Sequence, residues 1–228
     1  MRFIIIFLIL ICSNAFADNN YKKEIANFAE SLISAKYDAL PKQDSNEKLQ
    51  VSISPLDKRL TFTPCTTNLT GEIVGNKLKK NTSVKITCTA PDNWTTYIRA
   101  RVKRLVPSIA ANQALSKGQV LNSSNMKLIY TDSSMVKNGR FSTIDSLIGT
   151  RLKRNLSQDK IIKDRDVCFV CKNDKVTINA TKKGLSIKAS GIALNDANIG
   201  RTVRVKNSLT QRIIVGTVSA LKEVQVSF

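Results

Sequence analysis

The chain has 228 residues, of which 36 are lysine or arginine and 17 are aspartate or glutamate, so its formal net charge is +19 at pH 7. It contains no histidine, and this excludes the usual general base, the Ser-His and Cys-His nucleophile pairs and the commonest zinc ligand. The excess charge fits an anionic partner (nucleic acid, a membrane surface, a cell-wall polymer or an acidic protein), although it also serves solubility alone.

The first residues are typical of a Sec-type signal peptide. Arg2 precedes the apolar run 3–11, and the small-residue site Ala15-Phe16-Ala17 follows, so cleavage is expected after Ala17. The apolar run is too short to cross a bilayer, and no later stretch is long and apolar enough. We therefore expect an exported mature chain without a membrane span, which makes nucleic acid a poor candidate for the anionic partner.

A helix is expected between the leader and Pro41. Its apolar residues follow helical spacing: Tyr21, Ile25, Phe28, Leu32 and Leu40. We expect this apolar stripe to pack on its own domain rather than in the groove of a partner. From Leu49 the apolar period changes to two, which predicts short strands up to residue 105, among them a second strand at about residues 59–62 after a Pro-Leu-Asp turn.

The strand predicted at residues 94–103 has two different faces. Trp94, Ile98, Ala100 and Val102 form an apolar face, and Tyr97, Arg99, Arg101 and Lys103 form the other. Three cations on one strand surface are typical of a solvated face or a protected sheet edge, and a binding face is the alternative. Arg99, Arg101 and Lys103 are therefore the first candidate partner-binding residues.

The middle of the chain contains a repeat. Residues 115–126 align without gaps with residues 156–167, at a constant offset of 41 residues. Leu115 matches Leu156, and Gly118 and Asp159 share a turn position, where both tolerate unusual backbone angles. Two copies are too few for a solenoid, so a compact pseudo-symmetric β-rich domain is expected.

Five short strands are predicted after residue 174, with turns at 183–184, 195–196 and 222–223, and they indicate a small barrel or sandwich. Segment 191–207 is neither a P-loop nor a dinucleotide fingerprint, because the lysine with its following Ser or Thr is missing and a strand follows instead of a helix. Its alternating cations make Arg201, Arg204 and Lys206 the second candidate partner-binding residues.

Four cysteines remain after the predicted cleavage: Cys65, Cys88, Cys168 and Cys171. An even number in an exported protein indicates disulfides, and four cysteines allow three connectivities. We favour Cys65–Cys88, which closes a loop of moderate length, with Cys168–Cys171 as the second bridge. A thioredoxin-like redox site is disfavoured because strand-like sequence follows the Cys-x-x-Cys pair, and a four-cysteine zinc site is disfavoured by export and uneven spacing.

The tail resembles the closing domain of flagellar basal-body P-ring formation proteins, the FlgA family. The resemblance is carried by four features: the turn with Gly191, Ala193 and Leu194; Gly200; the strand residues Val203, Arg204, Val205 and Asn207; and the valine-rich final hairpin from Val215 to Val226. Upstream, residues 114–128 resemble the antifreeze-like (SAF) module of that family, and the copy at 156–167 resembles its second half. Residues 63–65, 84–88 and the Trp94 strand resemble its first β-domain.

The resemblance implies a mainly β protein with a short N-terminal helix. The expected parts are a signal peptide (1–17), a helix with a disulfide-tied β-domain (18–105), a SAF or β-clip-like module (106–168) and a small C-terminal β-barrel (169–228). It also implies a non-enzymatic periplasmic chaperone without cofactor or metal, which binds P-ring subunits near peptidoglycan and assists their assembly. The alternatives are a binding module for anionic cell-wall polymer, another pilus or secretion assembly factor, and a thiol oxidoreductase using Cys168 and Cys171.

Overall fold

The computed structural model describes residues 4–41, 46–136, 139–182 and 185–227. The chain divides into two compact units, Met1–Leu105 and Val106–Phe228. Its elements are one N-terminal helix followed by strands that include a closed C-terminal barrel. The predicted fold class, mainly β with an N-terminal helix and a small barrel, is confirmed. The domain boundaries expected from the sequence stay predictions.

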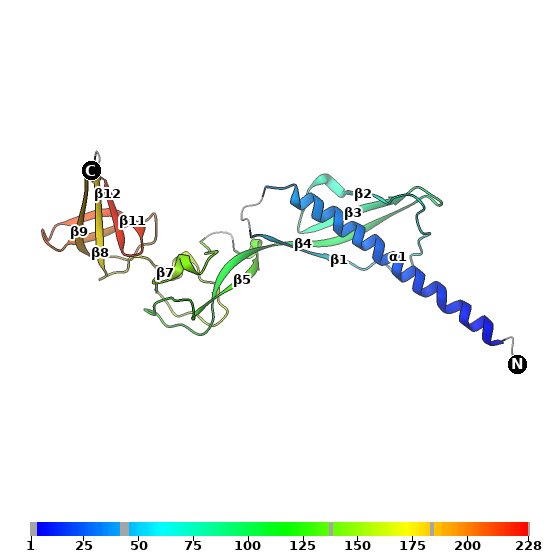
Figure 1. Ribbon diagram of the computed structural model, residues 1–228, viewed down its shortest axis with the longest axis horizontal. Helices are drawn as coiled ribbons and strands as arrows, with labels where there is room; N and C mark the ends of the chain where they lie inside the picture. The colour runs from blue at the N-terminus through cyan, green and yellow to red at the C-terminus, as the bar shows by residue number, and fades with distance from the viewer. Residues whose placement is uncertain (1–3, 42–45, 137–138, 183–184, 228) are drawn as a thin grey trace. The chain divides into compact units, whose positions relative to one another are not determined.

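Unit 1 is an antiparallel sheet with a helix packed on one face (Figure 1). Its elements are α1 (Ile4–Asp38), β1 (Lys48–Ile53), β2 (Thr70–Ile73), the 3-10 helix η1 (Val74–Asn76), β3 (Asn81–Cys88) and the part of β4 (Trp94–Ala111) up to Leu105; residues 106–111 of this strand belong to unit 2. The strand order is β1-β4-β3-β2, and each neighbouring pair is antiparallel. β4 alternates between buried and exposed side chains in this unit, as the two-residue period predicts.

Helix α1 packs through side chains spaced four residues apart. The buried ones are Tyr21, Ile25, Ala29, Ile33 and Tyr37. The first four of them meet the inner face of β3 and β4, so the stripe packs on its own unit, as expected. Phe28 and Leu32 are half-buried beside them. The inclusion of Leu40 was wrong, because α1 ends at Asp38 and Leu40 is exposed. Since α1 begins at Ile4, it also contains most of the predicted leader.

The strand expected at residues 59–62 is absent, and that segment is a loop. Phe62 packs on Trp94 instead, with 5.0 Å between the ring centroids. The Cys65 N–H donates to the Tyr21 hydroxyl at 2.8 Å, and a disulfide joins Cys65 to Cys88 at the end of β3. These contacts hold the loop against the helix and the sheet, so Phe62 is partly buried without strand pairing, whereas Leu60 stays exposed.

Unit 2 begins with a small module around the sequence repeat. Its elements are β5 (Met126–Asp132), η2 (Ser133–Met135), η3 (Asp145–Leu147), β6 (Arg151–Leu152), η4 (Asp164–Asp166) and β7 (Val167–Cys168). β5 pairs with β4, and β6 pairs with β7.

The two copies of the repeat are related by a pseudo-twofold arrangement of backbone hydrogen bonds. Leu115 and Leu156 each donate to the other's carbonyl at 2.9 Å. Gly118 donates to Leu152 at 2.8 Å, and Asp159 donates to Ala111 at 2.9 Å, which is the same bond shifted by the repeat offset. Both turn residues have positive φ, +84° at Gly118 and +65° at Asp159. The expected pseudo-symmetric module is therefore present.

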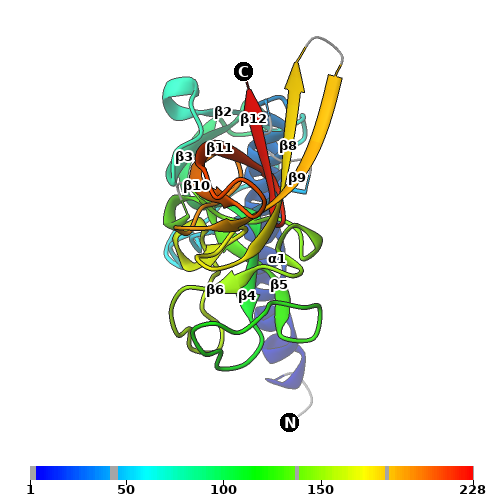
Figure 2. The ribbon, with the colours of Figure 1, turned by 90° about the vertical axis from the view of Figure 1, so that its left-hand side faces the viewer.

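The end of unit 2 is a closed five-stranded barrel (Figure 2). Its strands are β8 (Lys175–Lys182), β9 (Leu185–Ala193), β10 (Thr202–Asn207), β11 (Ile213–Ala220) and β12 (Glu223–Ser227). They close in the order β10-β11-β12-β8-β9, with β12 parallel to β8 and the other pairs antiparallel. The turn predicted at 183–184 lies outside the described residues.

One apolar core extends through the module and the barrel. It includes Leu121 and Ile162 from the two repeat copies and Val203 and Val205 from β10. Inside the barrel, Gly216 allows β11 and β12 to approach closely: a Cβ added there would lie 2.5 Å from Val224 Cγ1 and 2.8 Å from the carbonyl oxygen of Gln225.

Replacing Gly216 with alanine tests this close approach. Because the Gln225 carbonyl belongs to the backbone of β12, the strands must separate, and we expect Gly216→Ala to lower the free energy of unfolding by about 1–3 kcal/mol. Urea unfolding followed by circular dichroism measures the loss. The control is Ser219→Ala at an exposed site on the same strand, for which a change within about 0.5 kcal/mol is expected. Equal losses in both variants would contradict the close approach.

Candidate functional site

The outer face of the unit 1 sheet carries the first candidate cations. Tyr97, Arg99 and Arg101 are exposed on β4 and Lys103 is half-buried, while the residues between them point to the core under α1. We call Tyr97, Arg99, Arg101, Lys103 and the neighbouring Lys85 the basic sheet face. Across the described ranges, no carboxylate lies within ion-pair distance of Arg99, Arg101 or Lys103.

Strand pairing shows what surrounds these cations. β4 lies between β1 and β3, so it is no sheet edge here and the protected-edge interpretation was wrong. Ser52 and Asn81 lie opposite Arg101 on the two neighbouring strands, and Ser83 lies opposite Arg99. Small polar neighbours neither neutralise the guanidinium groups nor cover them. The cations therefore stand together in the middle of a solvent-facing sheet.

The second candidate set lies on the barrel. Arg204 and Lys206 are exposed on the outer side of β10, and Arg201 is exposed just before this strand. Arg201 is placed by its backbone, because its N–H donates to Asn198 at 2.9 Å and its carbonyl accepts from Val218 at 3.0 Å. The candidate partner-binding cations thus form two sets, one on the sheet of unit 1 and one on the barrel of unit 2.

Exposed aliphatic side chains accompany Arg204 and Lys206. Ile192 and Ile213 lie opposite Lys206 on β9 and β11, and Val215 lies opposite Arg204. We call these five residues the barrel face. Its three aliphatic members were not predicted from the sequence. Ile213 and Val215 gave no signal, because residues 213–216 are all apolar or glycine and show no alternation. Only the strand register reveals that Ile213 and Val215 point outward.

The Cys168–Cys171 pair is a disulfide with both cysteines buried, and Cys65–Cys88 is the other. This is the connectivity that the sequence favoured. No helix follows Cys171: the chain turns at Asn173 and enters β8. A helix N-terminus that would lower a thiol pKa, as redox sites of this spacing use, is therefore missing at this pair. Between the cysteines, Phe169 and Val170 are buried, and both N–H groups donate to the Ala197 carbonyl at 3.1 Å.

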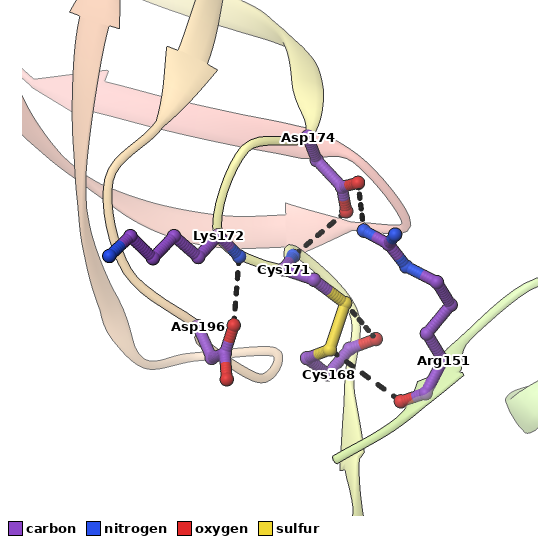
Figure 3. A network of polar contacts seen from close by, with 6 residues as sticks. All are labelled: Arg151, Cys168, Cys171, Lys172, Asp174 and Asp196. Carbon is purple, nitrogen blue, oxygen red and sulfur yellow. Dashed lines mark hydrogen bonds and ion pairs between the residues drawn. A yellow bond between two sulfur atoms is a disulfide. The ribbon is translucent and has the colours of Figure 1, made fainter. Parts of the chain in front are cut away.

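Asp174 holds the turn after the disulfide (Figure 3). One of its carboxylate oxygens accepts from the Cys171 N–H at 2.9 Å, and the other pairs with the Arg151 guanidinium of β6. Nearby, the Lys172 N–H donates to Asp196 at 2.8 Å. These contacts connect the module, the disulfide and the β9–β10 loop, so the geometry here is that of a structural joint.

Neither a metal site nor a membrane-crossing helix is found in the parts of the chain that the structure describes. No three side chains of the metal-binding types Cys, Asp and Glu are gathered there in a suitable group. Likewise, none of the helices in the described ranges combines the length and apolar character that a bilayer crossing requires.

Comparison with known families identifies the chain. The model described as "Chaperone for flagella basal body P-ring formation" matches residues 106–226, which is more than half of the sequence. The model described as "FlgA N-terminal domain" matches residues 23–103. The chain belongs to the FlgA family. The barrel face and the Cys168–Cys171 joint lie within the first match, and the basic sheet face lies within the second.

Individual FlgA proteins are more distantly similar. The flagellar protein FlgA of Rhizobium meliloti (strain 1021) is 28% identical over 122 residues, which are 52% of this chain and 73% of that protein. Salmonella FlgA, solved in an open form, is 16% identical, with 91% of this chain and 93% of that one covered and a TM-score of 0.46. The Thermotoga maritima FlgA structure is 16% identical, with 87% and 70% covered and a TM-score of 0.41.

In this FlgA-family chain, a buried polar cluster closes the end of α1. Tyr37 is buried there, and the side chain of Glu47 is only 3% exposed, with its carboxylate 3.8 Å from the Arg104 guanidinium. Burial raises the pKa of Tyr37, and the charge of Glu47 and the hydrogen bond to it raise this pKa further. The cluster lies on the inner side of β4, so Arg104 is not part of the basic sheet face.

The raised pKa of Tyr37 predicts an alkaline loss of stability. Below the ordinary value of 10.0, the neutral phenol contributes its full stabilisation; above it, the unfolded chain releases the proton first, so stability falls as the pH rises through the folded pKa. We expect wild type to exceed Tyr37→Phe in free energy of unfolding at pH 8, and this difference to shrink by pH 11. Urea unfolding at both pH values measures it, and a constant difference would refute the assignment.

Removing the Asp174 carboxylate tests the joint. Asp174→Ala leaves the Cys171 N–H without its acceptor and Arg151 without its partner, and we expect a loss of about 2 kcal/mol in the free energy of unfolding. Urea unfolding with both disulfides intact measures the effect. Asp145→Ala, at an exposed carboxylate of the same unit, is the control, with a change within about 0.5 kcal/mol. A loss no larger than that of the control would show that the network is dispensable.

Proposed function

We propose that this protein is a non-enzymatic periplasmic chaperone that binds subunits of the flagellar P ring and assists their assembly. The observation that carries the proposal is the match of residues 106–226 to the family of chaperones for P-ring formation. The two basic surfaces supply a physical means of binding. Lys85 pairs with Glu72 at 3.6 Å, but among the described residues no carboxylate lies within ion-pair distance of the six candidate cations Arg99, Arg101, Lys103, Arg201, Arg204 and Lys206, so these are open to an acidic partner.

Two features support the periplasm as the site of action. Arg2, the apolar run 3–11 and the small residues up to Ala17 form the pattern of a cleaved secretory leader. Both cysteine pairs of the remaining chain are disulfides, and such bonds persist in oxidising compartments outside the cytoplasm.

The charges suit a chaperone that has to release its partner. Exposed ion pairs contribute only about 0.2–1 kcal/mol each, so a group of them supports binding that other contacts can replace. They also accelerate encounter and suppress wrong partners more than they raise affinity. A P-ring subunit held in this way is shielded until contacts with other subunits of the ring displace the chaperone.

Sedimentation of the mature protein (residues 18–228) with the P-ring subunit of the same organism tests the proposal. We expect a discrete complex at low salt that weakens at moderate salt, because exposed charge interactions are screened. Neutralising both candidate sets (Arg99, Arg101, Lys103, Arg201, Arg204 and Lys206, each to Gln) should weaken the complex at low salt by about tenfold or more.

The control removes the same type of charge at other exposed lysines of unit 2, namely Lys117→Gln, Lys160→Gln and Lys172→Gln. It is compared with triple variants in which either candidate set is replaced alone. Each of these triple variants removes three positive charges, so a loss of binding due to the position of the charges can be told apart from one due to net charge. No complex at either salt would overturn the proposal and favour a module for anionic cell-wall polymer. A complex weakened equally by the control would overturn the role of the two surfaces.

A further inference from the structure

The barrel face exposes aliphatic side chains that the barrel core does not use. Val215 is 60% exposed, Ile213 53% and Ile192 37%. They are adjacent across β9, β10 and β11, because Ile192 and Ile213 both lie opposite Lys206. Single exposed aliphatic residues are ordinary, but a contiguous group rimmed by polar residues marks an interaction site.

The hairpin that joins β10 to β11 extends this group. Leu209 at its turn is 91% exposed. The turn is ordered, because the Asn207 side-chain oxygen accepts from the N–H groups of Leu209 and Thr210 at 2.9 and 3.0 Å. The backbone pair of Asn207 and Arg212, joined at 2.9 Å, closes the hairpin. Leu209 is therefore held out next to the barrel face rather than tucked beneath it.

A hollow of about 260 Å³ lies beside Val215 and Arg204, and Leu194 and Thr202 also line it. A hollow in a patch of exposed aliphatic residues accepts a side chain that projects from a partner. Proteins present such single projecting side chains, and interfaces place their anchors in pockets of this kind. A lipid surface offers no equivalent, so the hollow favours a protein partner over a membrane.

Charge restricts the partner further. Arg204 and Lys206 stand between the aliphatic side chains, and no carboxylate of the described residues pairs with either of them. A partner that covers the aliphatic group must therefore bring acidic side chains to these cations. A second copy of this chain would bring the same cations to the same place, so a symmetric self-association through this face is disfavoured.

We propose that the barrel face, together with Leu209, docks a segment of the P-ring subunit in which aliphatic side chains are flanked by acidic ones. The proposal rests on the proposed function for the identity of the partner and adds the chemistry of the contact. The aliphatic group supplies the burial that holds the segment, and the cations set its register. An aliphatic surface that pairs with other subunits in the finished ring is the kind of surface that a chaperone has to cover before assembly.

The test compares two matched double variants in binding to the P-ring subunit. Ile213→Ser with Val215→Ser removes two aliphatic groups from the barrel face. Val120→Ser with Leu128→Ser removes two equally exposed ones elsewhere in unit 2, at 50% and 49% exposure. We expect the first pair to weaken binding by about tenfold or more, because two buried aliphatic contacts are lost, and the second to leave it unchanged. Circular dichroism checks that both variants fold.

Hydrogen exchange of the wild-type complex gives a second readout that needs no variant. The amides of residues 207–213 should exchange more slowly in the complex than in the free protein. A complex that both double variants form equally well, without protection of 207–213, overturns the docking site and leaves the proposed function standing. Absence of any complex with wild type overturns both.

Sedimentation with phosphatidylglycerol vesicles tests the alternative that the barrel face binds a lipid surface instead of a protein. We expect the two double variants and wild type to sediment with them to the same extent. Vesicle binding that is lost in Ile213→Ser/Val215→Ser while subunit binding is unchanged would assign the barrel face to a membrane and overturn the protein partner.

Discussion

Strand pairing determines the direction of every side chain along β4 and β10, because successive residues of a strand point to opposite faces. On β4 this sends Ile98 and Ala100 under the helix and leaves Arg99 and Arg101 on the open side of the sheet. On β10 the valines fill the barrel and the cations face outward. The same backbone geometry thus produces both the apolar cores and the two basic surfaces.

The barrel and the pseudo-twofold module are joined by buried side chains rather than by a linker. Phe169 and Val170 belong to the common core of unit 2, and both donate to the carbonyl of Ala197 in the β9–β10 loop. The disulfide between the flanking Cys168 and Cys171 and the hydrogen bond from Cys171 N–H to the Asp174 carboxylate hold this short segment in its turn. The Cys-x-x-Cys spacing resembles that of a redox motif, but here the segment serves packing, since its two middle residues, Phe169 and Val170, make the contacts between the module and the barrel.

The two surfaces differ in what they offer a partner. The basic sheet face is polar throughout, apart from Tyr97, and suits attraction that salt weakens. The barrel face mixes cations with exposed Ile213 and Val215, and burial of such groups gives a contact that charge alone does not. In the proposed function the two surfaces would have different tasks: the cations would serve encounter, and the exposed aliphatic groups would serve specific holding.

Much of this structure follows from local sequence pattern. The alternation along β4, the repeat that becomes a pseudo-twofold module and the short strands of the barrel were all predictable, because period and turn chemistry act between near neighbours. Three features were not: the loop around Phe62, the interior position of β4 and the outward direction of Val215. They depend on which strands pair and which faces stay uncovered, and such contacts join residues far apart in the chain. The sequence by itself determined where the cations alternate, and only the tertiary structure decided which of them share a surface with exposed aliphatic groups.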